Sequence, residues 1–167
     1  MTLDEFNQMA PKELGKRLLQ CCGASQWVKK LISKRPYPSI DALEKKSTNI
    51  WERLDKDDWL EAFAQHPQFG DLSILPEKDL AASQMAASEQ SATVLANESV
   101  LETLAKNNRL YFEKFGYIFI ISATGKDAQE MLENLKQRLP NGPKQEILIA
   151  AEEQNKIIIL RLKKEIK

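Results

Sequence analysis

Apolar side chains recur along most of the chain at the three- and four-residue spacing that is typical of one face of an α-helix. The group Trp27, Val28, Leu31 and Ile32 shows this spacing in its shortest form. Glycine and proline separate the apolar stripes and end them. The pattern predicts helices from about residue 2, over 11–22, from 25, from 39, from 55 to about 66, over 77–95, over 99–115, around 131–139 and over 143–166.

Residues with helix-capping chemistry precede several of these segments. Thr2 and Glu5 have the spacing of a capping box, and Pro11 suits the first position of a helix. Ser25 and Ser39 are expected to act as N-caps of the helices that follow them. These residues set the expected helix starts.

One apolar run does not follow the helical period. Residues 117–121, Tyr-Ile-Phe-Ile-Ile, are rich in β-branched and aromatic side chains and follow Gly116. A lone five-residue strand has no partner for its backbone hydrogen bonds. We therefore expect an extended segment between helices rather than a sheet, which makes the fold class all-α.

Length and composition narrow the class further. The 167 residues suit one domain, residues 1–167, built as a bundle of about eight to nine helices with one short extended connector. Lys plus Arg and Asp plus Glu each number 24, so the formal net charge is zero, which disfavours a nucleic-acid partner. No apolar run reaches the roughly 20 residues of a membrane span, and no signal peptide is recognised. A soluble cytoplasmic protein without a membrane partner is expected.

Cysteine and histidine are too few for a metal cluster with conventional ligand spacing. Cys21 and Cys22 are neighbours, a spacing that suits neither a mutual disulfide nor a zinc knuckle, so we expect both to be reduced and buried. His66 is the one histidine of the chain. No metal ligands are assigned.

His66 is the first candidate for chemistry. It follows a predicted helix and precedes Pro67, and the residue before a proline is disfavoured in helical conformation. Its imidazole could act as a general acid or base at the helix end. Alternatively, it only caps the last helical carbonyls.

Glu89 is the second candidate. It lies among small side chains, Ala86, Ala87, Ser88 and Ala92, which allow another element to approach closely. Burial would raise the pKa of its carboxyl group and suit it to proton transfer. The alternative is a solvated glutamate on an alanine-rich helix.

Arg161 is the third candidate. On a helical projection it lies on the apolar side of the last predicted helix, with Ile157 and Ile158. An arginine there must reach solvent or meet an anion, and its fork of donors suits a carboxylate ligand. The alternative is an ion pair with Glu165 one turn later. One His, one Glu and one Arg without metal spacing would suit a cofactor-free reaction on an anionic small molecule.

Short motifs resemble one enzyme family over nearly the whole chain. They are Cys22-Gly23-Ala24, Trp27-Val28, Arg35-Pro36, residues 58–63 leading into His66-Pro67 and Gly70-Asp71, Glu89-Gln90, Asn108, Tyr111, Phe115-Gly116, residues 123–126, Arg138-Leu139, Asn141, Glu146, and Leu160-Arg161-Leu162. In order and register they resemble the 2-oxo-4-hydroxy-4-carboxy-5-ureidoimidazoline (OHCU) decarboxylases.

The resemblance implies an all-helical, homodimeric, cofactor-free enzyme of urate breakdown that forms S-allantoin and carbon dioxide. By position, His66 is similar to the catalytic proton donor, Glu89 lies beside it and Arg161 contacts the substrate anion. The implied substrate-lining residues are Pro67, Ala86, Ala87, Ser88, Gln90, Phe119, Ile120, Ile121, Ser122 and Ala123.

The chain departs from the family pattern at two places near Glu89. Ala86 stands where the family often has serine, and Ser91-Ala92 replaces a glycine after the Glu-Gln pair. Neither change removes a proposed proton-transfer group. Two other functions stay open: a non-catalytic helical binding module, and an enzyme of the same fold that acts on another small ureido or imide acid.

Overall fold

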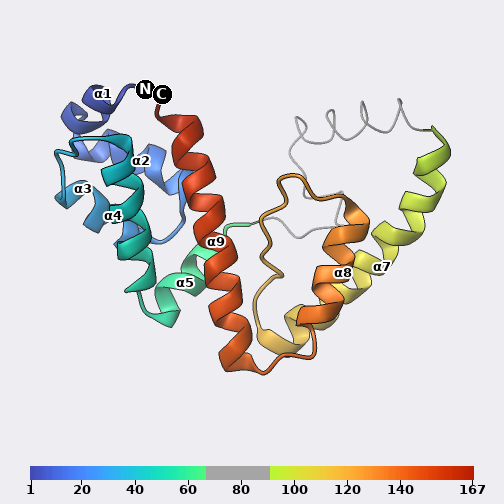
Figure 1. The fold of residues 1–167 in the computed structure, drawn as a ribbon. Helices are drawn as coiled ribbons and strands as arrows, with labels where there is room; N and C mark the ends of the chain where they lie inside the picture. Colours follow the sequence, from blue (N-terminus) through green and yellow to red (C-terminus); the bar gives the residue numbers. More distant parts are fainter. Residues whose placement is uncertain (67–90) are drawn as a thin grey trace. The chain divides into compact units, whose positions relative to one another are not determined.

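The computed structural model describes residues 1–66 and 91–167, and in them every regular element is an α-helix (Figure 1). This confirms the all-α prediction. The helices are α1 (Leu3–Gln8), α2 (Pro11–Cys21), α3 (Ser25–Ser33), α4 (Ile40–Glu52), α5 (Lys56–Phe63), α7 (Ser91–Phe115), α8 (Ala128–Arg138) and α9 (Pro143–Glu165).

The chain divides into two compact units. The first comprises Met1–Gln65 with Leu148–Lys167, and the second comprises His66–Ile147. The helix α9 starts in the second unit and continues into the first. The single-domain organisation over residues 1–167 stays a prediction, and each unit is described by itself below.

The first unit packs α1 to α5 and the C-terminal part of α9 around an aromatic core. Trp27 and Trp51 are buried, and their indole nitrogens donate hydrogen bonds to Ser47 Oγ at 3.2 Å and to the Ala151 carbonyl at 2.8 Å. Burying an indole requires such a partner for its N–H group. The chain ends also meet here, because the amino group of Met1 donates to the Glu165 carbonyl at 2.7 Å (Figure 1).

Side-chain caps explain the starts of α1, α4, α5 and α8, and one predicted cap needs correction. The Thr2 capping box and the Ser39 cap form as predicted, and Asp55 caps α5 at the predicted helix start. The prediction that Ser25 is an N-cap is wrong: Ala24 holds that position and Ser25 is the first helical residue. The backbone N–H and the hydroxyl of Ser25 instead bond Glu61 Oε2 at 3.1 and 3.2 Å. A carboxylate from α5 thus satisfies the first turn of α3, which local sequence cannot reveal.

The second unit contains α7, the segment after it, α8 and the start of α9. Gly116 has a φ of 82°, a left-handed conformation that glycine adopts easily, and it follows the last residue of α7. Residues 117–123 form neither helix nor strand, as the sequence predicts, and Asp127 starts α8 with a capping box.

The long helix α7 differs from its prediction. The sequence predicts one helix over 77–95 and another over 99–115, whereas a continuous helix covers Ser91–Phe115. The intervening residues Ala96, Asn97 and Glu98 include neither proline nor glycine, so nothing forces a break. Residues 77–90 of the earlier predicted helix lie outside the described residues.

In the part of the chain that the structure describes, no helix is both long and apolar enough to cross a membrane.

Both cysteines are buried, as predicted. Cys21 ends α2 and Cys22 is its C-cap, with 4% and 0% of their surfaces exposed. Burial raises the pKa of Cys21 to about 11 and that of Cys22 to about 12. At neutral pH these thiols are therefore protonated apolar groups of the core rather than nucleophiles.

We expect the cysteine pair to make folding stability fall at alkaline pH. Below an ordinary thiol pKa of 9.0 both thiols are neutral in both states, so their contribution is fully present. Above it the unfolded thiols ionise first, and each costs about 1.4 kcal/mol per pH unit until the folded pKa is reached. The measurement is urea unfolding at pH 8 and pH 10, with an expected loss from the pair of about 3 kcal/mol.

The control is the double variant Cys21→Ala, Cys22→Ala, which lacks both thiols but keeps every other group that titrates at alkaline pH. Its stability should fall less between the two pH values than that of the parent. Equal losses in both proteins would contradict the proposed role of the buried thiols.

Candidate functional site

His66 lies three residues beyond the end of α5. Its side chain is half-buried, and it is the first residue of the second unit. The last α-helical bond runs from the N–H of Ala64 to the Leu60 carbonyl at 3.0 Å, whereas the N–H of Gln65 bonds the Ala62 carbonyl, only three residues back, at 3.3 Å. The chain therefore leaves the helical path just before His66, as the following proline predicts.

The residue before His66 packs closely against Gly23. A Cβ atom built on Gly23 would lie 2.4 Å from Cδ and 2.7 Å from Cγ of Gln65, far inside van der Waals contact. Gly23 is itself buried. Glycine at this position therefore allows the Gln65 side chain to lie against the backbone that follows α2.

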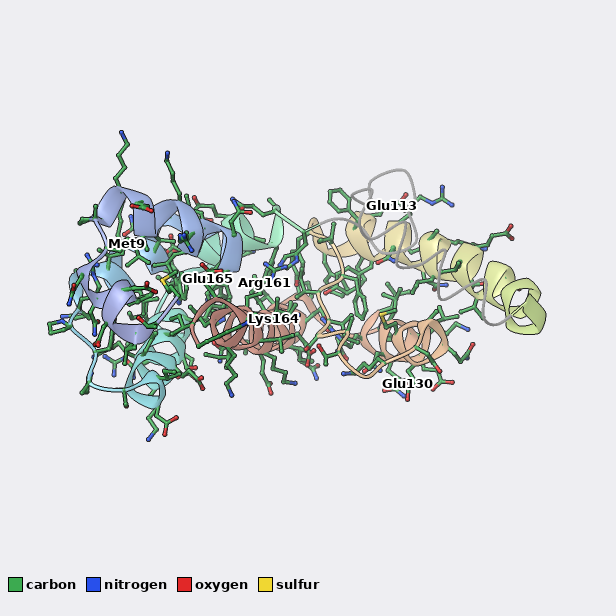
Figure 2. The ribbon with its side chains drawn as sticks, turned by 90° about the horizontal axis from the view of Figure 1, so that it is seen from above. Met9, Glu113, Glu130, Arg161, Lys164 and Glu165 are labelled. Carbon is green, nitrogen blue, oxygen red and sulfur yellow. The ribbon has the colours of Figure 1, made fainter. Side chains whose placement is uncertain are left out.

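Arg161 binds the carboxyl end of α2 (Figure 2). Its Nη1 atom donates to the carbonyl oxygens of Gln20 and Cys21, each at 3.3 Å, and the residue is half-buried. Unsatisfied carbonyls at a helix C-terminus carry partial negative charge and favour a cation. The same stretch, residues 20–23, thus contacts both Arg161 and Gln65.

The alternative of an Arg161–Glu165 ion pair does not form. Glu165 binds Arg17 instead, with 2.9 Å between Nη1 and Oε1. Among the described residues, Nε and Nη2 of Arg161 have no hydrogen-bond partner. Two donor positions of the guanidinium are therefore left for a ligand in this part of the chain.

The remaining predicted site residues fall into two groups. Those lying outside the described residues are Pro67, Ala86, Ala87, Ser88, Glu89 and Gln90. Of the second group, Phe119, Ile120 and Ile121 are 1–2% exposed, and Ser122 and Ala123 are half-buried. The predicted grouping of His66, Glu89 and Arg161 stays a prediction.

A buried ionic network lies next to the segment 117–123. The Glu146 carboxylate is fully buried, and its Oε1 atom lies 2.7 Å from both Nε and Nη2 of Arg138. Tyr111 donates to the same oxygen at 2.6 Å, and Asn141 donates to Oε2 at 3.0 Å. Burial and the Glu146 carboxylate raise the pKa of Tyr111 well above its usual range, so it stays a hydrogen-bond donor.

The four network residues belong to the family motifs in the sequence, but those motifs gave them no predicted place in the site. A signal was present in the spacing of α9, where Glu146, Ala150, Gln154 and Ile158 recur every four residues and all are buried. A carboxylate on that stripe must be buried, and a buried carboxylate requires a cation or several donors. The pattern could have indicated the burial, though not the partner.

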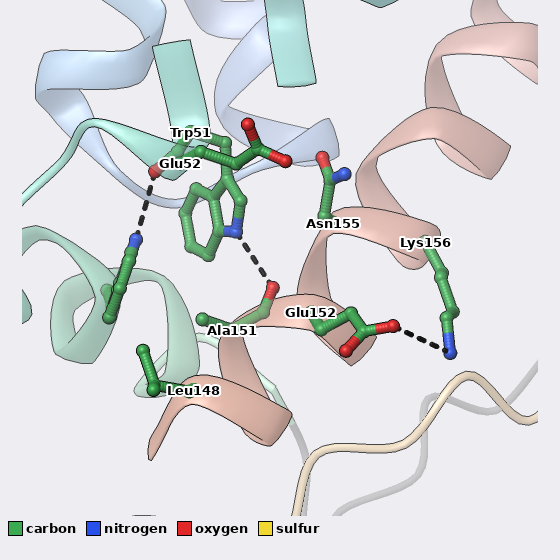
Figure 3. Close-up of a pocket in the computed structure, with 8 residues that line it drawn as sticks. Trp51, Glu52, Leu148, Ala151, Glu152, Asn155 and Lys156 are labelled. Atoms are coloured by element: carbon green, nitrogen blue, oxygen red, sulfur yellow. Dashed lines mark hydrogen bonds and ion pairs between the residues drawn. The ribbon is translucent and has the colours of Figure 1, made fainter. Parts of the chain in front are cut away.

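A surface pocket of the first unit contains none of the predicted site residues (Figure 3). Its volume is about 530 Å³, and its walls are the side chains of Trp51, Glu52, Trp59, Leu148, Ala151, Glu152, Asn155 and Lys156. The Trp51 indole closes one side by donating to the Ala151 carbonyl, and Glu152 pairs with Lys156 at 3.9 Å. It is distinct in composition from the site that the sequence predicts.

Together these features define an all-helical protein with a half-buried histidine just past the end of α5 and, in its first unit, an arginine bound to the end of α2. Within residues 1–66 and 91–167, no three His, Cys, Asp or Glu side chains gather in a way that could hold a metal ion. The family model described as OHCU decarboxylase matches residues 7–163. The chain belongs to this family.

Individual relatives agree with that assignment. The uric acid degradation bifunctional protein TTL of Arabidopsis thaliana is 42% identical over 146 residues, which cover 86% of this chain and 44% of the relative. The 2-oxo-4-hydroxy-4-carboxy-5-ureidoimidazoline decarboxylase of Halalkalicoccus jeotgali is 28% identical over 169 residues, covering 97% and 90%. The chain spans less than half the length of the bifunctional relatives that it matches.

Solved structures show the same fold. A crystal structure of an OHCU decarboxylase in the presence of (S)-allantoin is 39% identical and superposes with a TM-score of 0.70. The match covers 88% of this chain and 94% of that chain.

We expect a methyl group at position 23 to displace Gln65. The variant Gly23→Ala should lose about 1 kcal/mol of folding stability, because the new Cβ overlaps Cγ and Cδ of Gln65. Combining it with Gln65→Ala removes the collision, so the double variant should regain most of the loss. Urea unfolding of the parent, both single variants and the double variant gives the coupling energy. Additive effects would show that the contact does not restrict Gln65.

Proposed function

We propose that this chain catalyses the cofactor-free decarboxylation of 2-oxo-4-hydroxy-4-carboxy-5-ureidoimidazoline to S-allantoin and carbon dioxide. The observation that carries the proposal is the family match over residues 7–163. The similarity to a decarboxylase crystallised in the presence of (S)-allantoin supports it.

The substrate itself supplies the electron sink that decarboxylation needs. Its carboxylate and hydroxyl share one ring carbon, next to the C=N carbon that bears the ureido group. When the bond to carbon dioxide breaks, its electron pair forms a C=C bond with the ureido carbon, and the C=N pair moves to nitrogen, which takes a proton. The resulting enol becomes a carbonyl by losing its hydroxyl proton while the ureido carbon gains one. Protonation on one face yields a single enantiomer.

His66 is the proposed proton donor. Its position just past the end of α5 puts it on irregular backbone rather than in a helix, where a general acid can approach a ligand. Glu89, by the family resemblance, lies beside it and tunes it. A well-placed general acid of this kind contributes about 10²–10⁴-fold to the rate.

Arg161 is the proposed receptor for the substrate anion. Its Nη1 atom is held by two carbonyls of α2, which restricts the side chain before the ligand arrives. Its Nε and Nη2 atoms, unpartnered within the described residues, form an edge that matches the two oxygens of a carboxylate. Arg161 would therefore orient the substrate without taking part in proton transfer.

The extended segment would bind the ureido and ring amide groups through its backbone. Three carbonyls are already occupied: Ile120 accepts from Arg138, and Ser122 and Ala123 accept from Lys126. Among the described residues, the buried N–H groups of Phe119, Ile120 and Ile121 have no hydrogen-bond partner. Buried backbone donors are almost always satisfied, so unpaired ones support a ligand at this place. Pro67, residues 86–88 and Gln90 complete the proposed lining.

A cytoplasmic homodimer is part of the same proposal and is supported by the family resemblance. Equilibrium sedimentation tests the dimer. An enzyme of the same fold that acts on another small ureido or imide acid is the alternative function.

The activity is tested by making the substrate from urate with urate oxidase and hydroxyisourate hydrolase, then adding this protein. We expect faster appearance of S-allantoin by circular dichroism than in the spontaneous reaction, and the same rate in the presence of a metal chelator. An unchanged rate with fresh protein would reject the decarboxylase function. A rate abolished by chelator and restored by a divalent ion would reject the cofactor-free mechanism.

The variant His66→Ala should lower kcat by about 10²–10⁴-fold, since it removes the proposed proton donor. Its far-ultraviolet circular dichroism should match the parent, because His66 lies outside the helices. Near-normal turnover would remove His66 from the mechanism.

The variant Arg161→Lys keeps the charge but loses the two-pronged edge, so KM should rise by about tenfold with a smaller change in kcat. Arg17→Lys is the matched control, because Arg17 is an exposed arginine of the same unit that pairs with Glu165. Equal kinetics for the two variants would show that Arg161 is not the anion receptor.

A further inference from the structure

Arg138 connects the buried carboxylate of Glu146 to the backbone of the extended segment. Its Nη1 atom donates to the Ile120 carbonyl at 2.7 Å, while Nε and Nη2 face Glu146 Oε1. Its guanidinium also lies over the Phe119 ring, with 4.4 Å between Cζ and the ring centroid. Only 7% of Arg138 is exposed, so these contacts are shielded from water.

The anchor for Arg138 is itself held from two further elements. Tyr111 of α7 and Asn141, after α8, donate to the two oxygens of Glu146, whose surface is fully buried. The Tyr111 ring packs edge-on against Phe119, with centroids 5.3 Å apart. The guanidinium therefore has little freedom, and neither has the carbonyl that it binds.

Holding the Ile120 carbonyl also sets the direction of the next backbone donor. The carbonyl of Ile120 and the N–H of Ile121 belong to one planar trans peptide group, so they point in opposite directions. A hydrogen bond that fixes the oxygen on the Arg138 side fixes the N–H on the other side. Within the described residues that N–H has no partner, although Ile121 is 2% exposed.

We propose that Arg138 is a positioning residue that orients the Ile121 N–H as a hydrogen-bond donor to the substrate. The inference rests on the proposed function and extends it to a residue that does not itself contact the ligand. A fixed donor binds without an ordering cost, so its contribution is to substrate affinity more than to the proton-transfer step.

Lysine cannot replace arginine in this role. The guanidinium reaches Glu146 with one edge and Ile120 with another, whereas a single ammonium nitrogen cannot span both positions with the same geometry. In Arg138→Lys the pair with Glu146 can persist while the carbonyl contact is lost.

The test measures hydrogen–deuterium exchange of peptides covering residues 117–123, together with kcat and KM. In Arg138→Lys we expect exchange in this segment to be about tenfold faster and KM to be about tenfold higher, because one charge-assisted hydrogen bond is lost. We expect kcat to change less than about threefold. The matched control is Lys114→Ala, which removes a 2.7 Å bond from an exposed lysine to the Leu139 carbonyl of the same unit. It should change neither exchange in the segment nor KM.

A second variant keeps the proposal testable if Arg138→Lys folds poorly. Arg138→Met with Glu146→Gln removes both charges together and leaves an amide oxygen for Tyr111 and Asn141. It should show the same rise in KM and in exchange.

Two outcomes overturn the inference: an unchanged KM in either folded variant, or loss of stability without faster exchange in the segment. A parent protein that does not turn over the substrate overturns the proposed function instead. In that case the exchange rates alone decide whether Arg138 orders the Ile121 peptide.

Discussion

A fully buried carboxylate dictates the arrangement of the second unit. Removing Glu146 from water is costly, and the cost is offset only if a cation and further donors surround it closely. Arg138, Tyr111 and Asn141 meet that need from α8, α7 and the turn between α8 and α9. Breaking such a pair by removing one partner typically costs about 3–5 kcal/mol. The extended segment is attached to this network through the Ile120 carbonyl and the Phe119 ring.

In the first unit, the polar groups that need partners are backbone carbonyls rather than a carboxylate. The end of α2 leaves carbonyls without helical partners, and Arg161 binds two of them from α9. The next residues bring Gly23 against Gln65, directly before His66. One short stretch, residues 20–23, therefore restrains the anion receptor proposed above and the residue adjoining the proposed acid. Its two buried cysteines contribute packing, since burial keeps their thiols protonated.

In the function proposed above, irregular backbone within a helical protein has a chemical use. A helix consumes its own N–H and C=O groups, so it has few to offer a ligand rich in amides. The segment after Gly116 keeps buried donors available because it pairs with no strand among the described residues. A substrate that contains its own electron sink needs only a pocket of the right shape, hydrogen bonds and one proton donor from the protein. Buried backbone donors in the segment after Gly116 would supply the hydrogen bonds.

Local sequence determined the all-helical class, most of the helices, the irregular segment after Gly116 and the family, because periodicity, caps and Gly116 act over a few residues. Even locally, Ser25 was misassigned as a cap, since its helix start is satisfied by Glu61 from α5. Arg161 shows most clearly what local sequence could not predict. The local candidate for its partner was Glu165, one helical turn away, but its observed partners are backbone carbonyls 141 and 140 positions away along the chain. Likewise the sequence indicated that Glu146 is on a buried stripe but not that Arg138 joins it to Ile120. Such pairings were decided only by tertiary structure, because packing brings together groups whose separation along the chain carries no signal of their contact.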